Sequence, residues 1–148
     1  MLHFLFNLAL AKEAFLWSPG DIEQFSTKII NAALTTNDYP VTVGSTLLEL
    51  SCDYVFICLG TYPNNHVLQN GPEVDAIIEY LENGGNVYME GGDTWARDLP
   101  TDLHSYFRIR GAADGQADLS TITGAGCLSG VSFDYESEQQ YIDHLAPE

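Results

Sequence analysis

Basic residues are scarce in this sequence of 148 residues. Five lysines and arginines stand against 21 aspartates and glutamates, so the formal net charge at pH 7 is −16. Nucleic acids and anionic membrane surfaces are bound through clustered basic side chains, and these five form no cluster. We therefore predict no nucleic-acid partner and no membrane partner. The acidic excess is typical of a solubilising surface for salty or extracellular conditions, with a cation-binding surface as the alternative.

Cysteine is scarce as well. The three cysteines, Cys52, Cys58 and Cys127, include no C-x-x-C pair, which excludes a zinc ribbon and a thioredoxin-type redox motif. Cys58 lies in a continuous apolar run, which predicts a buried and inert thiol. Cys52 and Cys127 could form a disulfide only if the fold brings them together, and the sequence leaves that open.

Long hydrophobic runs are also missing, because no apolar segment reaches the roughly 20 residues that span a bilayer. Residues 1–11 are apolar and end in Ala9-Leu10-Ala11, similar to the end of a secretory signal, but no basic residue precedes them. We interpret residues 1–13 as an ill-defined N-terminal segment. The remnant of an export signal is the alternative.

The apolar residues that are present make up 45% of the sequence, enough to bury the core of one globular domain. Apolar runs alternate with amphipathic segments in the manner of an α/β protein. Helices are predicted to begin at Asp21 and Pro72, and strands are predicted over residues 14–17, 41–43, 53–60 and 86–90. This order predicts a mostly parallel sheet with right-handed crossovers.

Each predicted helix carries one apolar stripe at helical spacing. In the first helix the stripe comprises Ile22, Phe25, Ile29 and Ala33, widened by Ile30 and Leu34. In the second helix it comprises Val74, Ile77, Ile78 and Leu81, and Gly84 follows where a left-handed C-cap is wanted.

The pattern weakens after Trp95. Residues 99–107 predict a short helix with Leu103, Tyr106 and Phe107 directed inward, and residues 131–135 predict an antiparallel or edge strand. No closing strand or helix is recognisable beyond them. We therefore expect a sheet that is incomplete at the C-terminus, in a chain that is a fragment of a longer protein.

Five stretches of the sequence form one recognisable pattern: AFLWSP (14–19), DYVFICLG (53–60), NNHVL (64–68), GGNVYMEGGDTW (84–95) and DLSTI (118–122). Over residues 14–145 this pattern resembles the class I glutamine amidotransferase-like superfamily, and more narrowly its uncharacterised domains in large secreted bacterial proteins. The resemblance implies a flavodoxin-like three-layer sandwich with a mostly parallel sheet. It also implies a single amidotransferase-like domain over residues 1–148 and an extracellular or periplasmic location, with the cytoplasm as the alternative.

The catalytic residues of true amidotransferases do not carry over. FICLG (56–60) is similar to their G-x-C-x-G nucleophile elbow, but Phe56 stands where the elbow needs a small residue. His144 and Glu148 are four positions apart, whereas the family's histidine and acid are two apart. Chain order places the elbow at residues 89–93, where Gly91 takes the nucleophile's position and no cysteine or serine is present. We therefore expect no glutamine amidotransferase activity.

The predicted site is the bend at Gly91-Gly92, because ligands collect past the carboxyl ends of parallel strands. Glu90 and Asp93 flank the bend and would form a metal-binding pair or a general acid and base. Alternatively, Glu90 accepts hydrogen bonds from loop amides and Asp93 caps the next turn. His66 follows the neighbouring strand and is either a third catalytic group or a structural hydrogen-bonding residue.

An aromatic wall with one basic residue is predicted from Tyr62, Trp95 and Arg97, fit for a sugar or a carboxylate. The alternative is that Trp95 belongs to the core and Arg97 pairs with an aspartate. The predicted ligand-binding set is completed by Asn65, Gly91 and Gly92. The two glycines are no dinucleotide fingerprint, because G-x-G-x-x-G is absent and the flanking acids would repel a pyrophosphate.

Two functions fit these residues. The favoured one is a non-catalytic amidotransferase-like domain, structural or ligand-binding, in a secreted bacterial protein. Its partners would be a small molecule or other domains of a longer protein, and the edges of an incomplete sheet make self-association into a homo-oligomer plausible. The alternative is a hydrolase or metal-dependent enzyme that uses Glu90, Asp93 and His66. No cofactor is expected, with a divalent cation as the alternative.

Overall fold

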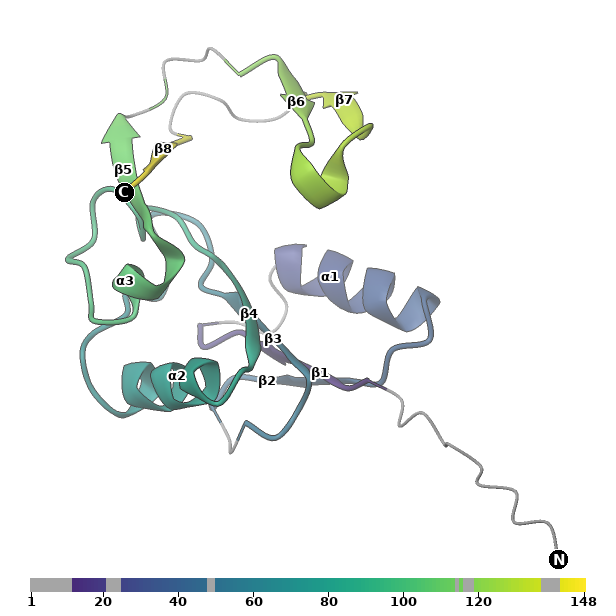
Figure 1. The fold of residues 1–148 in the computed structure, drawn as a ribbon, viewed down its shortest axis with the longest axis vertical. Coiled ribbons are helices and arrows are strands. Elements are labelled where there is room, and N and C mark those ends of the chain that lie inside the picture. The colour runs from purple at the N-terminus through teal and green to yellow at the C-terminus, as the bar shows by residue number, and fades with distance from the viewer. Residues whose placement is uncertain (1–11, 21–24, 48–49, 114, 116–118, 137–141) are drawn as a thin grey trace, which may run out of the picture. The chain divides into compact units, whose positions relative to one another are not determined.

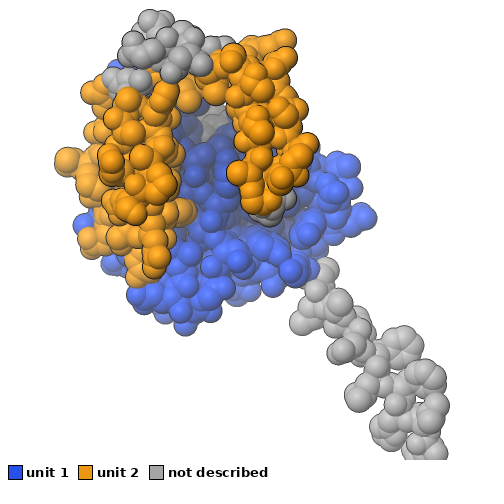
Figure 2. Space-filling model, turned by 45° about the horizontal axis from the view of Figure 1, so that its top comes forward, with its two compact units in different colours: residues 1–92 blue, residues 93–148 orange. Residues whose placement is uncertain are grey.

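The structure is a computed structural model that describes residues 12–20, 25–47, 50–113, 115, 119–136 and 142–148 (Figure 1). The chain divides into two compact units, residues 1–92 and residues 93–148, which Figure 2 colours separately. Most of the predicted N-terminal segment and the predicted helix start at Asp21 and Ile22 lie outside the described residues. No helix of the described ranges is both long and apolar enough to cross a membrane.

The first unit holds a four-stranded parallel sheet, which confirms the predicted α/β class. Its strands are β1 (Ala14–Trp17), β2 (Val41–Gly44), β3 (Tyr54–Cys58) and β4 (Asn86–Glu90), in the spatial order β2-β1-β3-β4. Two helices, α1 (Phe25–Thr36) and α2 (Pro72–Glu82), connect them. This order is consistent with a flavodoxin-like layout, in which the strand order reverses between β1 and β3.

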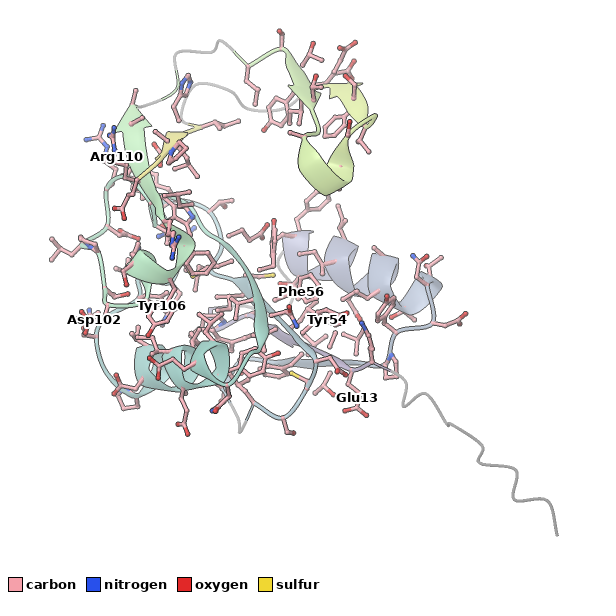
Figure 3. The ribbon with its side chains drawn as sticks, in the orientation of Figure 1. Glu13, Tyr54, Phe56, Asp102, Tyr106 and Arg110 are labelled. Atoms are coloured by element: carbon pink, nitrogen blue, oxygen red, sulfur yellow. The ribbon has the colours of Figure 1, made fainter. Side chains whose placement is uncertain are left out.

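Side chains alternate between the two faces of this sheet. The register pairs Leu16 with Phe56 and Phe56 with Tyr88, so these three residues point to the same face. Helix α1 packs on this face, because the hydroxyl of Thr27 donates to the hydroxyl of Ser18 over 3.1 Å. Phe56 is labelled on the α1 side of β3 in Figure 3.

The buried side of α1 differs from the predicted stripe. Phe25 is 80% exposed and Ile29 is 52% exposed, whereas Thr27 is buried. Of the other predicted positions, Ala33 is exposed, while Ile30 and Leu34 are half-buried. The physical reason is the polar surface beneath the helix, where Ser18 offers a hydroxyl that Thr27 can reach and an apolar side chain could not satisfy.

Helix α2 follows the prediction more closely. Val74 and Ile77 are fully buried, but Tyr80 takes the place predicted for Ile78 and Leu81, which are half-buried. The Tyr80 hydroxyl donates to the carbonyl of Cys52 over 3.1 Å, so the ring gains a polar partner that an aliphatic residue would lack. Gly84 has φ 86°, which confirms the predicted left-handed helix end.

The second unit is built from short elements. They are α3 (His104–Phe107), β5 (Ile109–Ala113), β6 (Thr121–Thr123), the 3-10 turn η1 (Gly126–Leu128), β7 (Ser132–Asp134) and β8 (His144–Pro147). Strands β6 and β7 pair antiparallel, as the alternation around β7 predicts, and β5 pairs antiparallel with β8. Strand β8 was not predicted, because it pairs with β5 across a long connection that leaves no local signal, and it belongs to a two-stranded sheet separate from the parallel one.

The interior of the second unit was predicted in part. Leu103 is fully buried, as predicted, and Phe107 packs on Trp95. Tyr106, however, is 43% exposed and does not point inward. The predicted helix over residues 99–107 shrinks to the four residues of α3, so Tyr106 falls on its outer side.

Candidate functional site

A cavity of about 430 Å³ lies at the carboxyl ends of β3 and β4, within the first unit. This is the end of a parallel sheet where ligands are expected, and the volume is in the range of small-molecule sites. The described residues that line it come from the first turn of α1 and from the ends of the two strands: Phe25, Ser26, Gly60, Thr61, Glu90 and Gly91.

Two glycines shape the backbone at this end of the sheet. Gly60 has φ 92°, a conformation that favours glycine, and it turns the chain away from β3. Its carbonyl accepts a hydrogen bond from the Gly92 amide over 2.8 Å. A Cβ atom on Gly92 would lie 2.6 Å from the backbone nitrogen of Tyr62, so the two loops can approach only because residue 92 has no side chain.

Glu90 supplies the only formal charge in the described lining. The Tyr88 hydroxyl donates to its Oε2 atom over 3.1 Å, and the Tyr88 ring contacts the Phe56 ring with centroids 5.8 Å apart. Burial, together with the neighbouring negative charge of Glu90, raises the pKa of Tyr88 to about 12. Tyr88 therefore stays protonated at neutral pH and holds the carboxylate in one orientation.

The raised pKa of Tyr88 makes a measurable prediction. Because folding favours the protonated phenol, its stabilising effect is complete below pH 10 and is lost as the pH rises toward 12. In an alkaline titration followed by phenolate absorbance, the Tyr88→Phe variant should lack the last tyrosine to ionise. It should also lose less stability than the wild-type protein between pH 10 and pH 12. If Tyr88→Phe instead removes a tyrosine that ionises with the bulk, the Tyr88 ring is not buried beside Glu90 in solution as the structure shows.

Cys58 lies beneath the cavity, next to Glu90 in the strand register. It is fully buried, as predicted, and burial raises the pKa of its thiol, although hydrogen bonds with Thr27 and Ser26 oppose that shift. A buried, protonated thiol is a poor nucleophile. The thiol of Cys52 forms no disulfide and donates a hydrogen bond to the Tyr54 carbonyl. The side chain of Cys127 lies outside what the structure describes.

His66 is not among the described residues that line the cavity, although its amide donates to the carbonyl of Leu59, next to the lining residue Gly60. Its Nε2 atom is 3.2 Å from the carboxylate of Glu73, in the first turn of α2, and its ring meets the edge of the Trp17 ring at 5.8 Å. Trp17 points to the opposite face of the sheet from Leu16 and Ser18, by strand alternation. The structure therefore brings His66 together with Glu73 and Trp17, and not with Glu90.

Asp93 belongs to the second unit, whereas Glu90 belongs to the first. Its backbone has φ 63°, and its carbonyl accepts hydrogen bonds from the amides of Ala96, Arg97 and Asp98 over 2.9–3.2 Å. Asp93 thus begins a tight turn, with its main chain as the acceptor. Arg97, on that turn, is exposed.

Trp95 is part of the interior of the second unit. Its ring packs edge-on against His104 and Phe107, with centroids 5.1 Å and 5.0 Å apart. His104 in turn accepts a hydrogen bond at Nδ1 from the Thr101 amide over 2.9 Å, and its Nε2 atom is 2.9 Å from the Thr94 carbonyl. The Thr101 hydroxyl also lies 3.0 Å from Nδ1, so the His104 side chain joins Thr94 and Thr101.

The remaining predicted ligand-binding residues follow β3. Tyr62 is 71% exposed, and its backbone nitrogen packs against Gly92. Asn65 lies on the same loop and is half-buried. Of the predicted set, the structure therefore places Glu90 and Gly91 in the cavity lining, with Gly92 and Tyr62 at the adjoining loop contact.

Four lining residues were absent from the predicted site: Phe25, Ser26, Gly60 and Thr61. Phe25 was assigned to the core stripe of α1, so helical periodicity concealed it. Gly60 and Thr61 directly follow the clearest predicted strand, and the rule that sites lie past carboxyl ends could have found them. Among the described residues, no group of three or more His, Cys, Asp or Glu side chains is placed to hold a metal ion.

No family model, curated protein or solved structure matches this chain. The resemblance to the amidotransferase-like superfamily therefore stays a prediction from the five sequence stretches. Function has to be inferred from the cavity and its lining.

Proposed function

We propose that this chain is a non-catalytic, amidotransferase-like α/β protein that binds a small molecule at the carboxyl ends of β3 and β4. The observation that carries the proposal is the chemistry of the cavity. Its described lining offers one carboxylate, two hydroxyls, one aromatic ring and two glycines, with no histidine, lysine or cysteine. Among the described residues, no histidine, lysine or cysteine lines the cavity beside Ser26 or Thr61 to activate either hydroxyl as a nucleophile. The lining is suited to holding a ligand.

We propose a flavodoxin-like three-layer sandwich as the scaffold of this site. The strand order β2-β1-β3-β4 supports it, as does the contact of α1 with Ser18 on one face of the sheet. On the other face, Trp17 contacts His66, and His66 pairs with Glu73 of α2. These contacts support a position of α2 on the face opposite α1.

We also propose that the protein acts outside the bacterial cytoplasm, as part of a longer secreted protein. The net charge of −16 supports an environment of high ionic strength, where salt screens the repulsion between acidic groups. Other domains of such a protein are then natural partners for the edges of the sheet at β2 and β4.

The proposal is tested by NMR titration with a library of small polar compounds, in parallel with assays of ester, amide and phosphoester hydrolysis. We expect saturable amide shifts at Ser26, Gly60 and Gly91, with no turnover. A second cavity, of about 250 Å³ at the opposite end of the sheet, provides an internal control. Its lining residues Val41 and Cys52 should not respond.

Two outcomes would overturn the proposal. Absence of any saturable shift at the cavity would remove the ligand-binding function. Turnover that disappears in Glu90→Gln, or that requires added Mg²⁺, Ca²⁺ or Zn²⁺, would support the hydrolase or metal-dependent alternative.

A further inference from the structure

We propose that the ligand of this cavity is a small organic cation, a primary ammonium or guanidinium group with a short apolar tail. The inference rests on the proposed ligand-binding function and narrows it to one chemical class. It depends on three features of the described lining: the charge of Glu90, the exposed ring of Phe25, and the hydroxyl groups of Ser26 and Thr61.

Glu90 is a carboxylate without a basic partner among the described residues. The Tyr88 hydroxyl donates a hydrogen bond to it, but this hydroxyl is neutral and leaves the negative charge of Glu90 uncompensated. The same hydrogen bond favours one orientation of the carboxylate group, which lowers the cost of ordering it on binding. A cation that enters the cavity would supply the missing counter-charge, at a half-buried position where the attraction is stronger than in bulk water.

Phe25 gives the cavity an aromatic surface. Its side chain is 80% exposed, so the ring is accessible to a ligand. An aromatic face attracts ammonium and guanidinium groups through the electrostatic field of the ring. A ring and a carboxylate that line one cavity form a pair suited to a cation with a short hydrocarbon tail.

The remaining lining gives no support to an anionic ligand. The hydroxyls of Ser26 and Thr61 can accept hydrogen bonds from N–H donors, and the described lining contains no lysine or arginine to bind a phosphate or carboxylate. At low ionic strength, the net charge of −16 also attracts cations toward the protein and repels anions.

The test uses three probes that share one hydrocarbon chain: butylammonium, butanol and butyrate. In NMR titrations of the whole chain, butylammonium should shift the Ser26, Gly60 and Gly91 amides saturably. Butanol and butyrate should bind at least about tenfold more weakly, because they lack the charge-assisted hydrogen bond. Methylguanidinium, added afterwards, should compete with butylammonium for the same amides.

Two substitutions locate the effect. Glu90→Gln keeps the side-chain shape and should weaken butylammonium binding about tenfold, whereas Phe25→Leu should weaken it about two- to fivefold. Glu73→Gln is the matched control, because Glu73 is a half-exposed acid that pairs with His66, away from the cavity. Its affinity for butylammonium should equal that of the wild-type protein.

The outcomes separate this inference from the proposed function. Equal weakening by Glu73→Gln and Glu90→Gln would mean that butylammonium is a diffuse counterion, which overturns the inference. Saturable binding of butanol or of methyl glucoside in preference to butylammonium would overturn the cationic class and leave the ligand-binding function standing. If no compound of any class shifts the cavity amides, both proposals fail.

Discussion

Replacing Trp17 with alanine is expected to lower the free energy of unfolding by about 3–5 kcal/mol. Trp17 is fully buried at the end of β1, between β2 and β3. Its indole N–H donates to the Ser45 carbonyl over 3.2 Å, and its ring contacts His66. The substitution leaves a large cavity beside the end of β1, and it leaves the Ser45 carbonyl without the indole N–H that donates to it. This loss is a large share of the total stability of a typical domain.

Urea denaturation followed by circular dichroism would measure the effect of Trp17→Ala. Ile29→Ala is the matched control, because Ile29 is 52% exposed on α1 and alanine is a strong helix former. Its stability should stay within about 0.5 kcal/mol of the wild-type value. A comparable loss in both variants would mean that α1 buries the stripe predicted from the sequence, contrary to the structure.

Replacing Gly92 with alanine is expected to destabilise the protein by about 1–3 kcal/mol, the usual range for an overpacked site, and to abolish ligand binding. The new Cβ atom would lie 2.6 Å from the Tyr62 nitrogen and 3.3 Å from the Thr61 Cα atom. Both are backbone atoms, so neither can rotate away. The loop that carries Thr61 must move, and the hydrogen bond between the Gly92 amide and Gly60 is strained or lost.

Gly44→Ala is the control for this prediction. A Cβ atom there would meet the Phe15 ring at 3.2 Å, and a side chain can shift by a few tenths of an ångström where backbone cannot. We expect Gly44→Ala to lower the free energy of unfolding by less than about 1 kcal/mol. The variant should bind ligand as the wild-type protein does. Binding that survives Gly92→Ala unchanged would show that the loop contact does not shape the cavity.

The parallel sheet could be predicted from the sequence because its signals are local. The apolar run at β3, the proline that opens α2 and the glycine that ends it each act within a few residues. Glu90 and Gly91 were predicted at the site for the same reason, since Glu90 is the last residue of β4 and Gly91 directly follows it. The bend lies where β4 ends, so predicting the strand also predicts the position of the bend.

The orientation of α1 could not be predicted, because two stripes satisfy helical spacing. One contains Phe25 and Ile29. The other contains Thr27, together with Ile30 and Leu34, which only widened the predicted stripe. Hydrophobicity favours the first, but the choice depends on Ser18, whose hydroxyl lies below the helix and bonds Thr27. A nonlocal polar contact therefore decides which face is buried, and with it whether Phe25 reaches the cavity.

The second unit was predicted least well, for a related reason. Strand β8 pairs with β5 across a connection of about 30 residues, and no local pattern reveals such a partner. Gly111 illustrates the point, because a Cβ atom there would lie 2.7 Å from the carbonyl of Trp95. The need for glycine at that position arises only after the chain has folded back.

The hydrogen bonds of His104 fix its tautomer. A backbone N–H can only donate, so Nδ1, which accepts from Thr101, carries no proton, and Nε2 must carry the proton that it donates to the Thr94 carbonyl. Both ring nitrogens thus have main-chain partners, and the ring connects the main chain at Thr94 with the main chain at Thr101.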